Sequence, residues 1–123
     1  MEMKKELVDL IFSKGELKHG IYDSTRETFE LFRTTAKDVI NQLKEHNAHT
    51  EKDMRFDFID RGDFEFEIRF ASDTLVFMMH TNIFEFSRNH EVMKSAYIRE
   101  DPERSYCGVI HIYNFLTDSF LYQ

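Results

Sequence analysis

The sequence predicts an α+β fold in which two N-terminal helices pack on a mainly antiparallel sheet of four to five strands. Up to His46, apolar residues recur every three to four positions, which is the period of a helix. From Met54 onward, short runs alternate apolar and polar residues between turn signals, which is the period of a strand. The 123 residues are 41% hydrophobic and include 13 Phe, so they fit a single domain over 1–123 that needs no disulfide to fold.

The first predicted helix covers residues 3–14. Its apolar side chains, among them Leu7, Leu10 and Ile11, lie at helical spacing. Gly15 follows as a typical C-terminal stop, and Gly20 breaks the chain again before the next element.

The second predicted helix begins at a capping box. Ser24 is the expected N-cap, and Glu27 stands three residues later, where it can reach back to the cap. An apolar stripe follows, made of Phe29, Phe32, Ala36, Val39 and Leu43. The stripe is short, which favours a helix docked on its own domain over a coiled coil, and we expect the helix to end near His46.

Residues 54–70 predict a β-hairpin. A three-residue loop over 60–62 keeps the apolar faces together by pairing Phe58 with Phe64. Such a loop needs a left-handed residue in its third place, where Gly62 stands.

The rest of the chain predicts further strands. Residues 74–79 form a continuous apolar run, which is typical of a central strand, and residues 83–86 are either a separate strand or its continuation. We expect a brief strand over 96–99 and a last strand over 106–115, with a turn at Pro102 between them.

Charge and composition exclude several classes of function. The net charge is −7 and no basic patch is visible, so we expect neither nucleic acid nor an anionic membrane as a partner. The single cysteine, Cys107, suits a reducing compartment, and charges interrupt the N-terminal segment where a signal peptide would be apolar. We therefore expect a cytoplasmic protein, and no motif calls for a cofactor.

The segments IFEFSRNHE, EDPERSYCGVI and YNFLTDSF carry a resemblance to a known group. With them the chain resembles a small family of uncharacterised proteins from anaerobic bacteria. The resemblance implies that members continue past the equivalent of Phe120, so that this chain would be a shortened form. It implies no activity, cofactor or site residue.

Acidic side chains of the hairpin are the first candidate site. In the predicted register, Asp57 lies opposite Glu65 and Arg55 lies opposite Glu67. Like charges that face each other are unfavourable unless a divalent cation binds between them. Asp57, Glu65 and Glu67 are the candidate ligands, since carboxylates are suitable for such an ion. The other interpretation is a solvated outer face on which Arg55 and Arg69 neutralise the neighbouring acids.

Two other groups are weaker candidates. Arg99 and Arg104 could grip a carboxylate or phosphate, or pair with the acids of their own loop. The six histidines form no compact metal motif, although His80 and His111 could meet across neighbouring strands. Cys107 and His111 would lie roughly 13 Å apart on one strand, too far for a nucleophile and its base.

The large number of aromatic residues supports the leading hypothesis, which is a non-enzymatic interaction domain that self-associates. One sheet face is expected to carry Phe56, Phe58, Phe64, Phe66 and Phe70. If helices cover this face only in part, the remainder is a homodimer surface or a pocket for a protein or small apolar ligand. The alternatives are a small metal-dependent hydrolase that uses the hairpin carboxylates, and a truncated remnant without activity.

Overall fold

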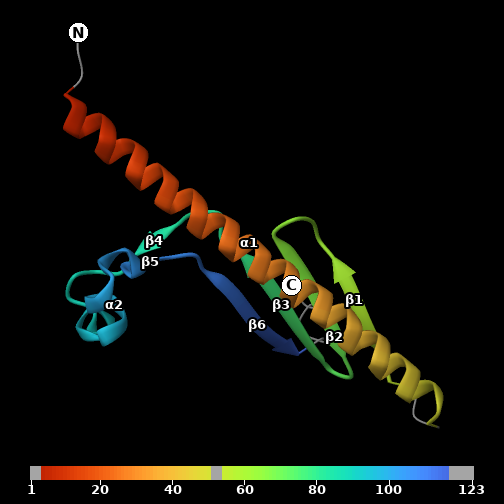
Figure 1. Ribbon diagram of the computed structural model, residues 1–123. Coiled ribbons are helices and arrows are strands. Elements are labelled where there is room, and N and C mark those ends of the chain that lie inside the picture. The colour runs from red at the N-terminus through yellow and green to blue at the C-terminus, as the bar shows by residue number, and fades with distance from the viewer. Residues whose placement is uncertain (1–3, 51–53, 117–123) are drawn as a thin grey trace. The chain divides into compact units, whose positions relative to one another are not determined.

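The computed structural model describes residues 4–50 and 54–116. It is an α+β structure with one long helix and antiparallel sheet (Figure 1). In chain order the elements are α1 (Lys5–Ala48), β1 (Phe56–Asp60), β2 (Glu65–Phe70), β3 (Asp73–Met79), β4 (Phe84–Glu85), η1 (Glu91–Lys94), α2 (Ala96–Glu100), η2 (Pro102–Ser105), β5 (Tyr106–Cys107) and β6 (Ile110–Leu116).

A single helix replaces the two that the sequence predicts. α1 passes without a break through Gly15 and Gly20, and through Ser24, the predicted N-cap. Neither glycine has the positive φ that a helix stop requires. A glycine inside a helix costs about 1 kcal/mol relative to alanine, which a long helix tolerates. The prediction of two helices was therefore wrong.

The buried face of α1 is centred one residue away from the predicted stripe. Phe29, Ala36 and Ile40 are buried together with Arg33, whereas Phe32 and Val39 remain 36% and 44% exposed. The predicted stripe is thus half core and half surface.

The main sheet has four strands in the order β1-β2-β3-β6, and every neighbouring pair is antiparallel. β3 lies inside this sheet, as the apolar run over 74–79 predicted. β4 is separate from β3 and pairs only with β5 among the described strands, so residues 83–86 do not continue the central strand. The predicted last strand is likewise two strands, β5 and β6.

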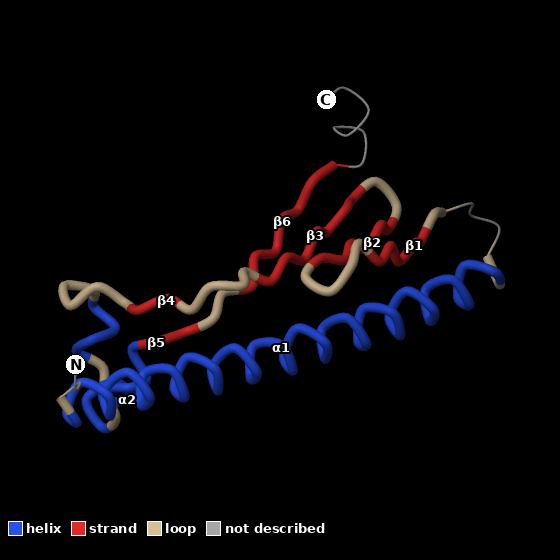
Figure 2. The backbone as a smooth tube through the Cα atoms, turned by 90° about the horizontal axis from the view of Figure 1, so that it is seen from above, coloured by secondary structure: helices blue, strands red, loops and turns tan. Residues whose placement is uncertain are grey.

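α1 covers one face of the main sheet through aromatic contacts (Figure 2). The ring of Phe66, which is fully buried, lies 5.2 Å from Phe29, 5.6 Å from Phe58 and 4.6 Å from Phe77, measured between centroids. The aromatic residues of the strands therefore form a core between α1 and the main sheet, as the alternation of apolar and polar residues along the strands indicated.

The hairpin exists, but its predicted register was wrong. Phe58 pairs with Ile68 rather than Phe64, because four residues, 61–64, connect β1 and β2. The partner of Phe58 shifts from Phe64 to Ile68, which is an even number of positions. Because side chains alternate between the two faces of a strand, the apolar side chains stay on one face. Gly62 has a φ of +118°, which confirms the left-handed backbone predicted there.

Arg33 explains why the longer loop is preferred. Its side chain, 9% exposed, bonds Asp60 Oδ1 at 2.8 Å and donates to the carbonyl oxygen of Gly62 at 2.8 Å. A second bond reaches the carbonyl of Asp63 at 3.1 Å. A buried guanidinium needs such acceptors, and the loop supplies three of them.

The predicted strand over 96–99 is a helix, α2. The Ser95 hydroxyl accepts a hydrogen bond from the Ile98 amide and caps the helix. Ile98 is buried, with 4% of its surface exposed. In so short a segment, a capping serine and a buried side chain in the turn that follows are sufficient to favour a helix over the predicted strand.

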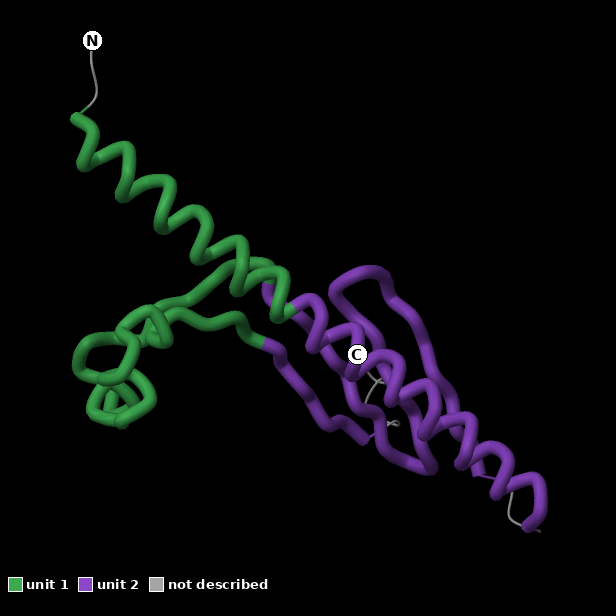
Figure 3. The backbone as a smooth tube through the Cα atoms, in the orientation of Figure 1, with its two compact units in different colours: residues 1–25, 81–109 green, residues 26–80, 110–123 purple. Residues whose placement is uncertain are grey.

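The chain divides into two compact units (Figure 3). The first consists of Met1–Thr25 and Thr81–Val109, and within it Gly108 approaches Thr25 so closely that a Cβ at Gly108 would lie 2.1 Å from Oγ1. The second consists of Arg26–His80 and Ile110–Gln123 and holds the main sheet. The expectation of one domain stays a prediction.

No helix within 4–50 and 54–116 is long and apolar enough to cross a bilayer.

Candidate functional site

The corrected register separates the predicted metal ligands. Asp57 lies opposite Arg69, and Ile59 rather than Arg55 lies opposite Glu67. Glu65 stands four positions before Arg69 on β2, which is roughly 13 Å along the strand. Asp57 and Glu65 therefore cannot ligate one ion, because each ligand must lie within about 2.5 Å of it.

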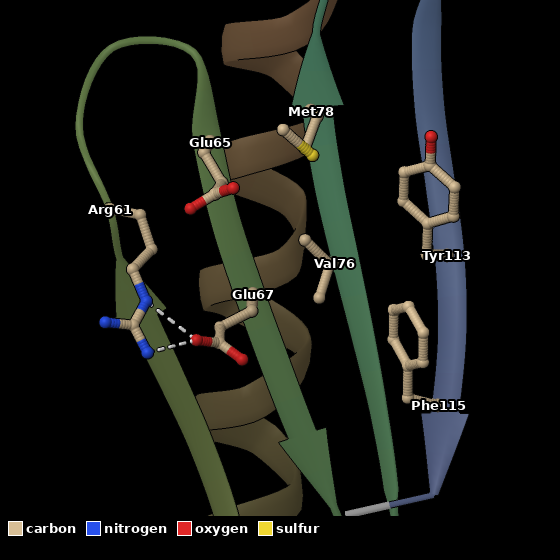
Figure 4. A pocket seen from close by; sticks show the side chains of 7 residues that line it. All are labelled: Arg61, Glu65, Glu67, Val76, Met78, Tyr113 and Phe115. Atoms are coloured by element: carbon tan, nitrogen blue, oxygen red, sulfur yellow. Dashed lines mark hydrogen bonds and ion pairs between the residues drawn. The ribbon is translucent and has the colours of Figure 1, made fainter. Parts of the chain in front are cut away.

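Glu67 is held by two arginines instead. Figure 4 shows its pairing with one of them, Arg61. The side chain of Glu67 is 6% exposed, and Oε1 accepts hydrogen bonds from Arg61 Nε at 2.7 Å and Nη2 at 2.5 Å. Arg69 Nε lies 3.7 Å from Oε2 of Glu67; this nitrogen is buried and has no hydrogen-bond partner among the residues that the structure describes. A buried carboxylate compensated in this way is a structural ion pair. The alternative interpretation expected a solvated face on which Arg55 and Arg69 neutralise the acids, whereas Glu67 is buried and Arg61 supplies its hydrogen bonds.

A depression of about 520 Å³ lies beside this ion pair. One end carries Arg61, Glu65 and Glu67, and the other end is apolar and aromatic, with Val76, Met78, Tyr113 and Phe115 (Figure 4). The described residues contain no group of three or more His, Cys, Asp or Glu side chains able to hold a metal ion. The depression thus offers a charge-compensated surface without a cluster of ligands.

The histidines take part in local packing. His80 and His111 do meet, with ring centroids 6.4 Å apart, and His111 also stacks on Tyr113 at 5.7 Å. Nδ1 of His90 accepts a hydrogen bond from the Val92 amide and so caps η1. Cys107 and His111 lie on different strands, β5 and β6, so the predicted geometry of one shared strand does not apply.

Of the two candidate arginines, Arg104 pairs with its own loop. It lies 3.6 Å from Glu100 and 3.9 Å from Asp101, and its guanidinium stacks 4.5 Å above the ring of Tyr97. Arg99 is exposed in the last turn of α2. The alternative prediction, in which the arginines pair with the acids of their own loop, therefore agrees with the contacts of Arg104.

An apolar groove on the helix-facing side of the main sheet is the feature best suited to binding. It has a volume of about 370 Å³ and is lined by Leu31, Phe32, Thr35, Ala36, Val39, Ile68 and Phe77. α1 contributes its exposed apolar edge, and β2 and β3 contribute the floor. The aromatic face could be predicted from the sequence, but the side on which the helix leaves it open could not.

Two findings explain why the groove stays open. The helix packs toward β1, where Lys37 Nζ lies 5.1 Å above the ring of Phe58. On the other side, Phe32 meets Phe77 only at the ring edge, with centroids 6.4 Å apart, and β6 lies clear of the helix (Figure 1). Ile112 of β6, which pairs with Phe77, is consequently 52% exposed.

Comparison with known proteins finds no matching family model, curated protein or solved structure. The resemblance to a family of proteins from anaerobic bacteria therefore stays a prediction. The function of the groove must be inferred from the chemistry of its lining.

Proposed function

We propose that the chain is a non-enzymatic interaction domain that self-associates through the apolar surface around the groove. The observation that carries this proposal is the incomplete cover of the aromatic sheet face by α1. Leu31 and Val39 are 63% and 44% exposed beside the groove. Contiguous apolar surface of this kind is typical of protein–protein contacts.

The chemistry of the groove favours a protein surface over a polar substrate. Apart from Thr35, its lining consists of aliphatic and aromatic side chains, and none is charged. Burial of apolar area contributes about 25 cal/mol per Å² of transfer free energy, which must exceed the entropic cost of association. The groove offers nothing to orient a reacting polar group.

The competing hydrolase has less support. Its three carboxylates do not converge, and the most buried of them, Glu67, is already neutralised by Arg61. General base catalysis needs a carboxylate within reach of a water or substrate, which an arginine-bound Glu67 does not provide.

Sedimentation equilibrium at high micromolar concentration tests the proposal. We expect dimers whose affinity rises with salt, because two copies of charge −7 repel each other and salt screens the repulsion. Val39→Asp should weaken association at least tenfold by placing a charge on the groove.

The matched control is Asn41→Asp, which adds the same charge to an exposed position of α1 outside the groove. It should leave association within twofold of the parent chain. A strict monomer at all concentrations, or equal effects of the two variants, would contradict the proposal.

A further inference from the structure

Among the described strands of the main sheet, the edge strand β6 alone has no charged side chain. Among the described strands it pairs on one side only, with β3. Its sequence, IHIYNFL, has no Asp, Glu, Lys or Arg in a chain in which 32% of residues are charged. The other edge strand, β1, is shorter and carries Asp57 and Asp60. Edge strands usually carry charges or prolines that prevent pairing with another chain, and β6 does not.

Both faces of β6 also expose apolar surface. On the helix-facing side, Ile112 is 52% exposed next to Phe77. On the opposite side, Tyr113 is 43% exposed and stacks on His111. A strand added beside β6 would cover both.

We propose that β6 pairs antiparallel with β6 of a second copy, around a two-fold axis at Ile112, so that the sheet continues across two copies. This inference rests on the proposed function, because it adds the edge of β6, which adjoins the groove through the pair Phe77–Ile112, to the apolar surface through which the chain self-associates. In this arrangement Ile112 faces Ile112 of the second copy, His111 faces Tyr113, and Ile110 faces Asn114. Paired residues share a face of the sheet, so the two Ile112 side chains meet on the helix-facing side and the rings of His111 and Tyr113 meet on the opposite side.

A second copy fits this edge better than an unrelated partner for two reasons. A two-fold contact is self-complementary, so one strand supplies both halves of the interface. Each copy carries a charge of −7, so two copies can approach most closely along a segment without acidic residues, and Ile110–Asn114 is such a segment.

The pairing would also enlarge the apolar surface of the groove. Phe77 and Ile112 lie side by side in each copy. Across the two-fold axis they form one row, from Phe77 and Ile112 to Ile112 and Phe77 of the second copy. The exposed aromatic surfaces of the two copies thereby become continuous.

Cysteine cross-linking in the full chain tests the register, with Cys107→Ser as background. Ile112→Cys should form a disulfide-linked dimer under mild oxidation, since a disulfide requires Cα atoms about 4.4–6.8 Å apart. Ile110→Cys and Asn114→Cys should cross-link when mixed, and neither should cross-link alone. Cross-linking of each alone but not of the mixture would indicate parallel strands and overturn the inference.

Ile112→Lys provides an independent measurement. A lysine on the edge should weaken dimerisation at least tenfold, whereas Ile112→Thr, which keeps a β-branched side chain, should weaken it less than threefold. A dimer in sedimentation that neither cross-links at Ile112 nor responds to Ile112→Lys would overturn only the β6 contact. A monomeric parent chain would overturn the proposed function itself.

Discussion

At the scale of single residues, the loop between β1 and β2 is organised by Asp60. Its carboxylate accepts a hydrogen bond from the Gly62 amide at 3.0 Å and from Arg33 at 2.8 Å. The Gly62 bond, followed by the charges of Arg33 and Lys37, lowers the pKa of Asp60 below its ordinary value, although partial desolvation opposes the shift. The ionised form is therefore the one that holds the loop.

A pH-dependent loss of stability should follow. Because the pKa of Asp60 is lower in the folded state, its contribution is present above the unfolded-state value of 3.8 and disappears as the pH falls through the folded-state value. Asp60→Asn should thus lower the melting temperature at neutral pH and have little effect at about pH 2.

Thermal unfolding followed by circular dichroism at both pH values measures this difference. Asp63→Asn is the matched control, since it removes a carboxylate from the same loop and leaves the bonds of Asp60 to Gly62 and Arg33 in place. An effect of Asp60→Asn that is equal at both pH values would contradict the assignment.

At the scale of elements, α1 is the main departure from the predicted structure. Two glycines and a capping box predict a break, yet the helix has no break between Lys5 and Ala48. Leu17 and Ile21 continue the apolar spacing across the predicted gap, and both are half-buried. Local stop signals are worth about 1 kcal/mol each, so a continuous apolar face can outweigh them.

Alanine substitution of the two helix glycines distinguishes a continuous helix from two helices. Gly15→Ala and Gly20→Ala should each raise the free energy of unfolding by up to about 1 kcal/mol, because alanine is the better helix former. Nothing lies within 4 Å of the added methyl group at either position.

Gly62→Ala is the contrasting substitution, because its φ of +118° is strained for any residue with a side chain. It should lower the free energy of unfolding in urea, while the helix substitutions raise it. Destabilisation by Gly15→Ala would instead indicate that the helix ends at Gly15.

At the scale of the whole molecule, each compact unit has its own buried residues. Ile98 and Ser105 are buried in the unit that contains α2, and Phe66, Ile68 and Ile40 are buried in the unit that contains the main sheet. Local stability should therefore depend on which of these residues is removed.

Hydrogen exchange followed by mass spectrometry can locate the loss. Phe66→Ala should cost about 3–5 kcal/mol and reduce protection first in β1, β2, β3 and β6. Ile98→Ala should act first on residues 81–109. Leu31→Ala, at a position that is 63% exposed, should change protection little. Identical exchange patterns for Phe66→Ala and Ile98→Ala would show that the units do not unfold separately.

The α+β class, the hairpin, the central strand β3 and the left-handed backbone at Gly62 could all be predicted from the amino-acid pattern. These features follow from apolar periodicity and turn chemistry, which act over a few residues. The amino-acid pattern also placed Glu65 and Glu67 together on the outer face, because side chains alternate along a strand.

Only the tertiary structure decided the hairpin register, the continuity of α1 and the place where the aromatic face stays open. The register depends on Arg33, which lies 27 residues before its partner Asp60. The groove depends on the side of the sheet over which α1 lies. Glu67 accepts its hydrogen bonds from Arg61, which the sequence placed in the hairpin loop. The contacts of α1 join residues far apart in the chain, and their energies have no counterpart in local sequence patterns.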